Sequence, residues 1–119
     1  VISIGQIGIE VQKAITNNNL ASYVTHLDAR CMKPLDLKAL KMVFSKFKKV
    51  ITVEESCLLG GFGQHVKTLA LDAQYRGSIS TLGLPDEFVE HGTVDELRAK
   101  YDLHAEGIGK TISQILLPL

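Results

Sequence analysis

The feature that most constrains the fold is a short run of β-branched, mostly apolar residues, Val50–Val53, that leads into a glycine-rich turn. A second run of this kind, Val1–Ile4, stands at the start of the chain. Strands that are covered by helices on both faces read as continuous apolar runs, whereas half-exposed strands alternate between apolar and polar residues. The two runs therefore predict a mainly parallel sheet that is buried between helices.

The order of the segments supports the same fold. We predict four strands, at Val1–Gly5, Tyr23–Asp28, Val50–Glu54 and Ile79–Leu84. The stretches between them are long enough for the helical crossovers that parallel strands require, so the chain is typical of an α/β fold. We expect residues 1–119 to form a single domain, because the sequence contains no repeat, low-complexity segment or linker and this length suffices for one core.

Apolar residues at helical spacing predict five helices. They are about Gly8–Asn18, a helix after Asp36, about Gly61–Tyr75, a helix that begins at Thr93, and about Ala105–Leu116. The residues expected to be buried are Ile7, Val11 and Ile15, then Leu37, Leu40, Phe44 and Phe47, then Val66, Leu69, Ala70 and Ala73, then Leu97 and Tyr101, and finally Ile108, Ile112, Ile115 and Leu116. We expect Asp36 to cap its helix, and Thr93 and Glu96 to form a capping box.

The composition excludes several classes of partner. Thirteen basic residues balance thirteen acidic ones, so we expect neither nucleic acid nor a membrane as partner. No apolar run approaches the roughly 20 residues that span a bilayer, and we expect a cytoplasmic protein. Cys31 and Cys57 show no metal-binding spacing, and we expect them to be buried, reduced thiols.

In an open parallel sheet, ligands bind at the carboxyl ends of the strands where the winding reverses, here between the first and third strands. The turn Gly60–Gly63 lies there and leads into a helix N-terminus, which could hold an anion. Its glycine spacing, however, fits neither a dinucleotide fingerprint nor a P-loop, and Glu54 and Glu55 precede it without a nearby Lys or Arg. We interpret Gly60, Gly61 and Gly63 as allowing a tight turn and close packing against a neighbouring surface; a ligand or effector contact is the alternative.

Glu54 and Glu55 are poor candidates for an acid–base pair, because adjacent strand residues point in opposite directions. We expect one to form hydrogen bonds or an interface and the other to be solvated. The four histidines have no metal-ligand spacing. His65, in the first turn of its helix, is the best candidate among them for a polar contact, and His26 is expected to be a half-buried, hydrogen-bonded strand residue.

Arg30 lies just beyond the second strand, where its guanidinium could bind a carboxylate through two hydrogen bonds. The alternative is an internal pair with Asp28 or Asp36 that holds the loop before the second helix. The sequence leaves both interpretations open.

Four segments resemble a known family. Leu27–Asp36 and Val50–Gly63 resemble the C-terminal domain shared by deoxyxylulose-phosphate synthases and the β-subunits of 2-oxoacid dehydrogenases. Gly83–Thr93 and Asp95–Gly107 are similar to the synthases and unlike the dehydrogenase tail. The chain is thus identified as a member of the transketolase-like family of thiamine-diphosphate enzymes, on the synthase branch.

This resemblance implies a three-layer α/β/α domain with a mainly parallel sheet of five strands, one of them antiparallel. Only four strands are legible here, so we expect the antiparallel strand to be lacking and the chain to be a fragment of a larger multidomain enzyme. The synthases condense pyruvate with glyceraldehyde 3-phosphate, with decarboxylation, in isoprenoid-precursor and thiamine biosynthesis.

In the family, thiamine diphosphate and Mg²⁺ bind between the two preceding domains, whose motifs this sequence does not contain. The resemblance therefore implies an inactive fragment with no catalytic, cofactor-binding or metal-binding residue, which associates with the preceding catalytic domains and with a second subunit of a homodimer. The candidate interface or loop-positioning residues are Arg30, Glu55, Gly60, Gly61, Gly63 and His65. The alternatives are the corresponding domain of a dehydrogenase β-subunit and a stand-alone module that binds small anions.

Overall fold

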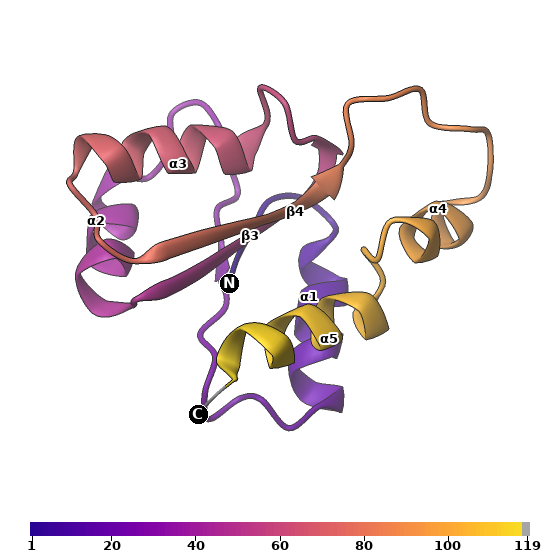
Figure 1. Cartoon of the computed structure of the whole chain (residues 1–119), viewed down its shortest axis with the longest axis horizontal. Coiled ribbons are helices and arrows are strands. Elements are labelled where there is room, and N and C mark those ends of the chain that lie inside the picture. Colours follow the sequence, from indigo (N-terminus) through magenta and orange to yellow (C-terminus); the bar gives the residue numbers. More distant parts are fainter. Residues whose placement is uncertain (118–119) are drawn as a thin grey trace.

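The computed structural model describes residues 1–117 and contains a four-stranded parallel sheet. The sheet lies between two layers of helices (Figure 1). The strands are β1 (Ile2–Ser3), β2 (Leu27–Asp28), β3 (Lys49–Cys57) and β4 (Ser78–Leu84). They lie in the order β2-β1-β3-β4, and each adjacent pair is parallel. The predicted three-layer α/β/α architecture is confirmed, and the winding reverses between β1 and β3 as expected.

The helices are α1 (Gly8–Asn17), α2 (Leu37–Lys46), α3 (Phe62–Asp72), α4 (Val94–Lys100) and α5 (Ala105–Leu116). In Figure 1, α2 and α3 cover one face of the sheet, and α1 and α5 lie on the other. Successive side chains of β3 point to opposite faces of the sheet. Ile51 and Val53 join the core under α1 and α5, whereas Val50 joins the core under α2 and α3. The strand is therefore apolar on both faces because both faces are covered.

Three strand predictions were wrong in extent. The first strand, predicted as Val1–Gly5, pairs only at Ile2 and Ser3. The second strand, predicted from Tyr23, pairs only at Leu27 and Asp28, because the chain before it folds into turns in which Tyr23 N–H donates to the carbonyl of Leu20. The third strand does not end at Glu54 but continues to Cys57, with an irregular register after Val53. This extension fixes the orientation of both glutamates in the candidate site.

Some burial predictions also failed. Leu37 is exposed because the buried face of α2 follows Leu40 and Val43 instead. Ala73 is exposed because α3 ends at Asp72, before the predicted Tyr75. The apolar positions predicted for α1 are buried, and those predicted for α5 are buried or partly buried.

Asp36 and Thr93 cap their helices as expected, but the hydrogen bond from the Thr93 N–H to the Glu96 side chain, the other half of the predicted capping box, is not formed among the described residues. Asp36 accepts a hydrogen bond from the backbone N–H of Ala39 at 3.0 Å, and Thr93 accepts one from that of Glu96 at 3.1 Å. Both thiols are free, but Cys31 is exposed and Cys57 only half-buried, so the expectation of buried cysteines was wrong. Within residues 1–117, no helix is long and apolar enough to cross a bilayer.

Candidate functional site

The glycine turn lies at the carboxyl end of β3 and leads into α3. Gly60 has a φ of +73°, a backbone conformation that favours glycine. Gly61 is the N-cap of α3 and supplies no capping side chain. The first N–H groups of α3 therefore need acceptors from another part of the chain.

Glu54 supplies that acceptor. One of its carboxylate oxygens accepts the N–H of Phe62 at 2.9 Å, and the other accepts that of Gly63 at 2.7 Å. The hydroxyl of Ser56 donates a further hydrogen bond to the same carboxylate at 2.6 Å. Glu54 is completely buried, so a carboxylate of the chain itself occupies the place where an external anion would bind. This arrangement argues against the small-anion-binding alternative.

Two of the glycines in the turn are required by packing inside the chain. A Cβ atom on Gly61 would collide with the Glu54 carboxylate and the Cys57 carbonyl. A Cβ atom on Gly63 would press on Thr52 and Thr81, on the sheet face beneath α3. The neighbouring surface that the sequence led us to expect is thus, at these two positions, the protein's own sheet.

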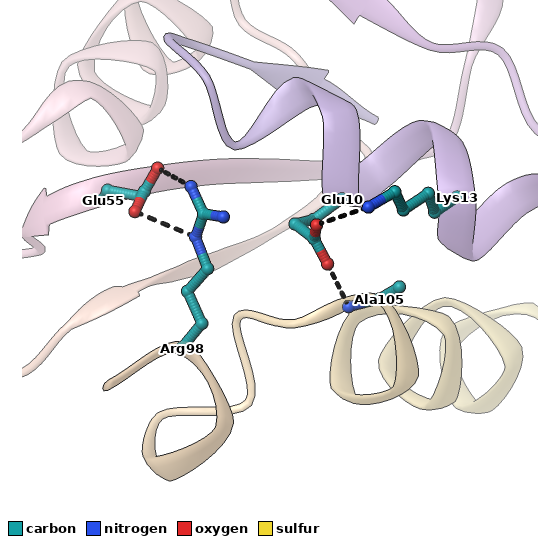
Figure 2. Close-up of polar contacts among 5 residues, drawn as sticks. All are labelled: Glu10, Lys13, Glu55, Arg98 and Ala105. Atoms are coloured by element: carbon teal, nitrogen blue, oxygen red, sulfur yellow. Dashed lines mark hydrogen bonds and ion pairs between the residues drawn. The ribbon is translucent and has the colours of Figure 1, made fainter. Parts of the chain in front are cut away.

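Glu55 points away from the glycine turn, toward α4. Its two carboxylate oxygens accept hydrogen bonds from the Arg98 guanidinium, at 2.8 Å from Nη2 and 3.1 Å from Nε (Figure 2). These hydrogen bonds raise the pKa of Arg98 above its ordinary value. The two adjacent glutamates therefore do point to opposite sides, but Glu55 is paired with α4 instead of standing free for another domain.

A second carboxylate contact fastens the C-terminal helices. Glu10 of α1 accepts the backbone N–H of Ala105, the first residue of α5, at 2.9 Å, and its other oxygen lies 3.3 Å from the Lys13 ammonium (Figure 2). The N-termini of α3 and α5 are thus each satisfied by a glutamate from a different element, Glu54 and Glu10. This use of carboxylates couples helices to strands and to one another.

Arg30 lies after β2 in a left-handed conformation, with a φ of +60°. Its backbone N–H donates to the Asp28 carboxylate at 2.9 Å, so Asp28 holds the loop by a backbone contact. Arg30, Asp36 and Phe62 line one hollow at this end of the sheet, which brings Arg30 near the start of α3. His65 is exposed in the first turn of α3.

The predicted residues therefore fall in three places. Gly60, Gly61, Gly63 and His65 form the turn and the start of α3, Arg30 lies across a hollow from Phe62, and Glu55 faces α4. Sequence reasoning did not single out Glu54 as the residue that organises the turn. The sequence could have indicated this role, because Glu54 lies two and four positions after Thr52 and Val50. In a strand this spacing places all three side chains on one face, here the face that α3 covers.

Comparisons with known proteins cover nearly the whole chain. A family model described as "Transketolase, C-terminal domain" matches residues 2–108. A 1-deoxy-D-xylulose-5-phosphate synthase from Cytophaga hutchinsonii is 39% identical over 118 residues, and one from Phocaeicola vulgatus is 40% identical over 114 residues. These matches include 97% and 94% of this chain but only 18% of each relative.

The fold is also found in a solved structure. A protein described as "Split gene transketolase, inactive beta4 tetramer" superposes with a TM-score of 0.81 at 24% sequence identity. The match covers 97% of this chain and 38% of that one. At this identity the likeness establishes the architecture.

Proposed function

The chain belongs to the transketolase C-terminal domain family, and from that premise we propose that it is the C-terminal domain of a 1-deoxy-D-xylulose-5-phosphate synthase. The observation that carries the proposal is the extent of the likeness to the named synthases, which covers 97% of the chain. It includes Gly83–Thr93 and Asp95–Gly107, the segments whose pattern resembles the synthases and not the dehydrogenase β-subunits. Because the chain spans 18% of those relatives, residues 1–119 form, in this proposal, one domain of a longer cytoplasmic enzyme.

The full-length enzyme would condense pyruvate with glyceraldehyde 3-phosphate and release carbon dioxide. Thiamine diphosphate supplies the carbanion chemistry in such enzymes, with Mg²⁺ as its metal. In this proposal neither group binds to the residues of this chain. The N-terminus of α3 is occupied by Glu54, and residues 1–117 contain no cluster of three His, Cys, Asp or Glu side chains that could hold a metal. We assign both groups to the preceding domains.

The role that remains for this chain is association. We propose that it braces the preceding catalytic domains and contributes to a homodimer, and that it is inactive alone. Gly60, His65 and Arg30 remain candidate interface residues, since all three are exposed. Gly61 and Gly63 act in this proposal through the shape of the turn, because their close contacts lie inside the chain.

The first test is the size and activity of the native protein. An immunoblot of a cell extract with an antibody against residues 1–119 should detect a chain several times larger than 13.0 kDa. That purified chain should form 1-deoxy-D-xylulose 5-phosphate from pyruvate and glyceraldehyde 3-phosphate, and a truncated form without residues 1–119 should lose assembly and activity together. A native species near 13.0 kDa, or a large one without this activity, would contradict the proposal.

A further inference from the structure

The loop between β4 and α4, residues 85–92, projects away from the body of the protein (Figure 1). Phe88 in this loop has a relative exposure of 103%, so water surrounds the whole ring. The chain is nevertheless tied down at two points before Phe88, at the end of β4 and at Glu87. Leu58 N–H donates to the carbonyl of Leu84 at 2.9 Å, and Tyr101 donates its hydroxyl hydrogen to Glu87 at 3.5 Å. The structure therefore holds an aromatic side chain out into solvent from an anchored loop.

Other exposed apolar residues border the same loop. Leu59 of the glycine turn, Val89 and Val94 have relative exposures of 62%, 36% and 58%. One hollow beside the loop is lined by Leu59 and Pro85, and another by Val89 and Val94. We call the set Leu59, Phe88, Val89 and Val94 the carboxyl-edge surface. Scattered exposed apolar residues are ordinary, but two hollows with exposed apolar lining beside a loop that carries a fully exposed aromatic ring mark an interaction site.

The charges of the loop indicate the kind of surface that would cover it. Asp86, Glu87 and Glu90 flank Phe88, and residues 85–92 contain no Lys or Arg. A complementary surface would offer an apolar socket with a basic rim.

The loop follows the carboxyl end of β4, whereas Val1 lies at the amino ends of the parallel strands. A segment directly preceding Val1 would therefore join the domain at the opposite end of the sheet.

We propose that the carboxyl-edge surface docks onto the folded catalytic part of the full-length enzyme, with Phe88 inserted into a basic-rimmed apolar socket. This inference rests on the proposed function, because the relatives extend well beyond this chain, which spans 18% of their length. In this proposal the glycine turn also contributes to docking, because it fixes the end of β3 and so places Leu59 beside the projecting loop.

The test uses the full-length polypeptide that carries this chain, with Phe88→Cys and a matched variant, Leu71→Cys. Leu71 is 78% exposed on α3, and peptide mapping by mass spectrometry separates each introduced thiol from Cys31 and Cys57. We expect a maleimide to label the thiol of the Phe88→Cys variant at least tenfold more slowly in the native protein than in the denatured one. The Leu71→Cys variant serves to show that the reagent reaches an exposed thiol. Equal native and denatured rates in the Phe88→Cys variant would overturn the proposal.

Phe88→Cys itself removes the aromatic side chain that is proposed to dock. The unmodified protein therefore provides a second measurement. Hydrogen exchange of backbone amides 88–92 should be at least tenfold slower in the full-length enzyme than in an unstructured peptide of that sequence, and Phe88→Ser should abolish this protection. Fast exchange in the unmodified enzyme would also overturn the docking. The synthase assay distinguishes failure of the docking from failure of the proposed function. A protected loop in a protein without synthase activity would contradict only the proposed function. A freely exchanging loop in an active synthase would contradict only the docking.

Discussion

One carboxylate oxygen of Glu54 accepts the backbone N–H of Gly63 at 2.7 Å, across the junction between β3 and α3. The two residues are nine positions apart, and both are buried. The contact requires a charged acceptor on the strand and the absence of a side chain on the helix, because a Cβ atom on Gly63 would meet Thr52 and Thr81. The glycine turn is therefore built around a carboxylate of the chain itself.

Replacement of this carboxylate should be costly. We expect Glu54→Gln to lower the free energy of unfolding by about 2–3 kcal/mol, because an amide presents donors where the site holds N–H and O–H donors. Urea denaturation of the two proteins measures the difference. Asp72→Asn, an exposed change at the other end of α3, should alter stability by less than about 0.5 kcal/mol. Equal effects of the two substitutions would show that Glu54 does not organise the turn.

Gly60 and Gly63 should respond differently to the same pair of substitutions. At Gly60 the φ of +73° is the constraint, and a Cβ atom placed there would have no atom within 4 Å, so Gly60→Asn should be tolerated better than Gly60→Ala. At Gly63 the constraint is space, so Gly63→Ala should destabilise by about 1–3 kcal/mol and Gly63→Asn by more. Melting temperatures of the four variants give the comparison. The same order of Ala and Asn at both positions would refute this explanation.

The pair between Glu55 and Arg98 joins β3 to α4 but is only partly shielded, with side-chain exposures of 36% and 16%. We expect a coupling energy of about 0.5–1 kcal/mol in a double-mutant cycle of Glu55→Gln and Arg98→Gln. The coupling should decrease in 1 M salt, where charges are screened. Arg98→Lys should not restore it fully, because an ammonium cannot reproduce the two-pronged contact. A coupling that salt leaves unchanged would indicate packing instead of ion pairing.

His26 gives a prediction about pH. Its Nε2 lies 2.7 Å from the Ser3 hydroxyl, and burial lowers the pKa of His26 below the ordinary 6.5. As the pH falls through 6.5, the unfolded chain therefore takes up a proton before the folded one does, which favours unfolding. The stabilising contribution is complete above pH 6.5 and is lost as the pH falls toward the folded pKa.

Wild-type protein should accordingly lose stability between pH 7.5 and 5.5, by no more than about 1.4 kcal/mol per pH unit from this residue. His26→Gln should show a smaller loss over the same range, as measured by urea midpoints at the two pH values. An unchanged loss in the variant would mean that other groups account for the pH dependence.

Much of the fold was predictable because it follows from local patterns. The continuous apolar run at Val50–Val53 predicted a strand covered on both faces, and the apolar spacing after Ala105 predicted the last helix with the bounds it has. The polar residues at Asp36 and Thr93 predicted two helix starts. Local signals failed where pairing decides the structure: nothing in residues 23–26 shows that only Leu27 and Asp28 find a neighbouring strand.

The sequence by itself determined the alternation of strands and helices, the glycine turn and the family likeness, since each depends on residues close together in the chain. Only the tertiary structure decided the partners of the charged groups. Glu54 meets α3 and Glu55 meets Arg98, 43 residues away, because β3 continues to Cys57 and presents its two faces to different helices. Long-range contacts of this kind depend on how the layers stack, and the residues adjacent in sequence do not predict that stacking.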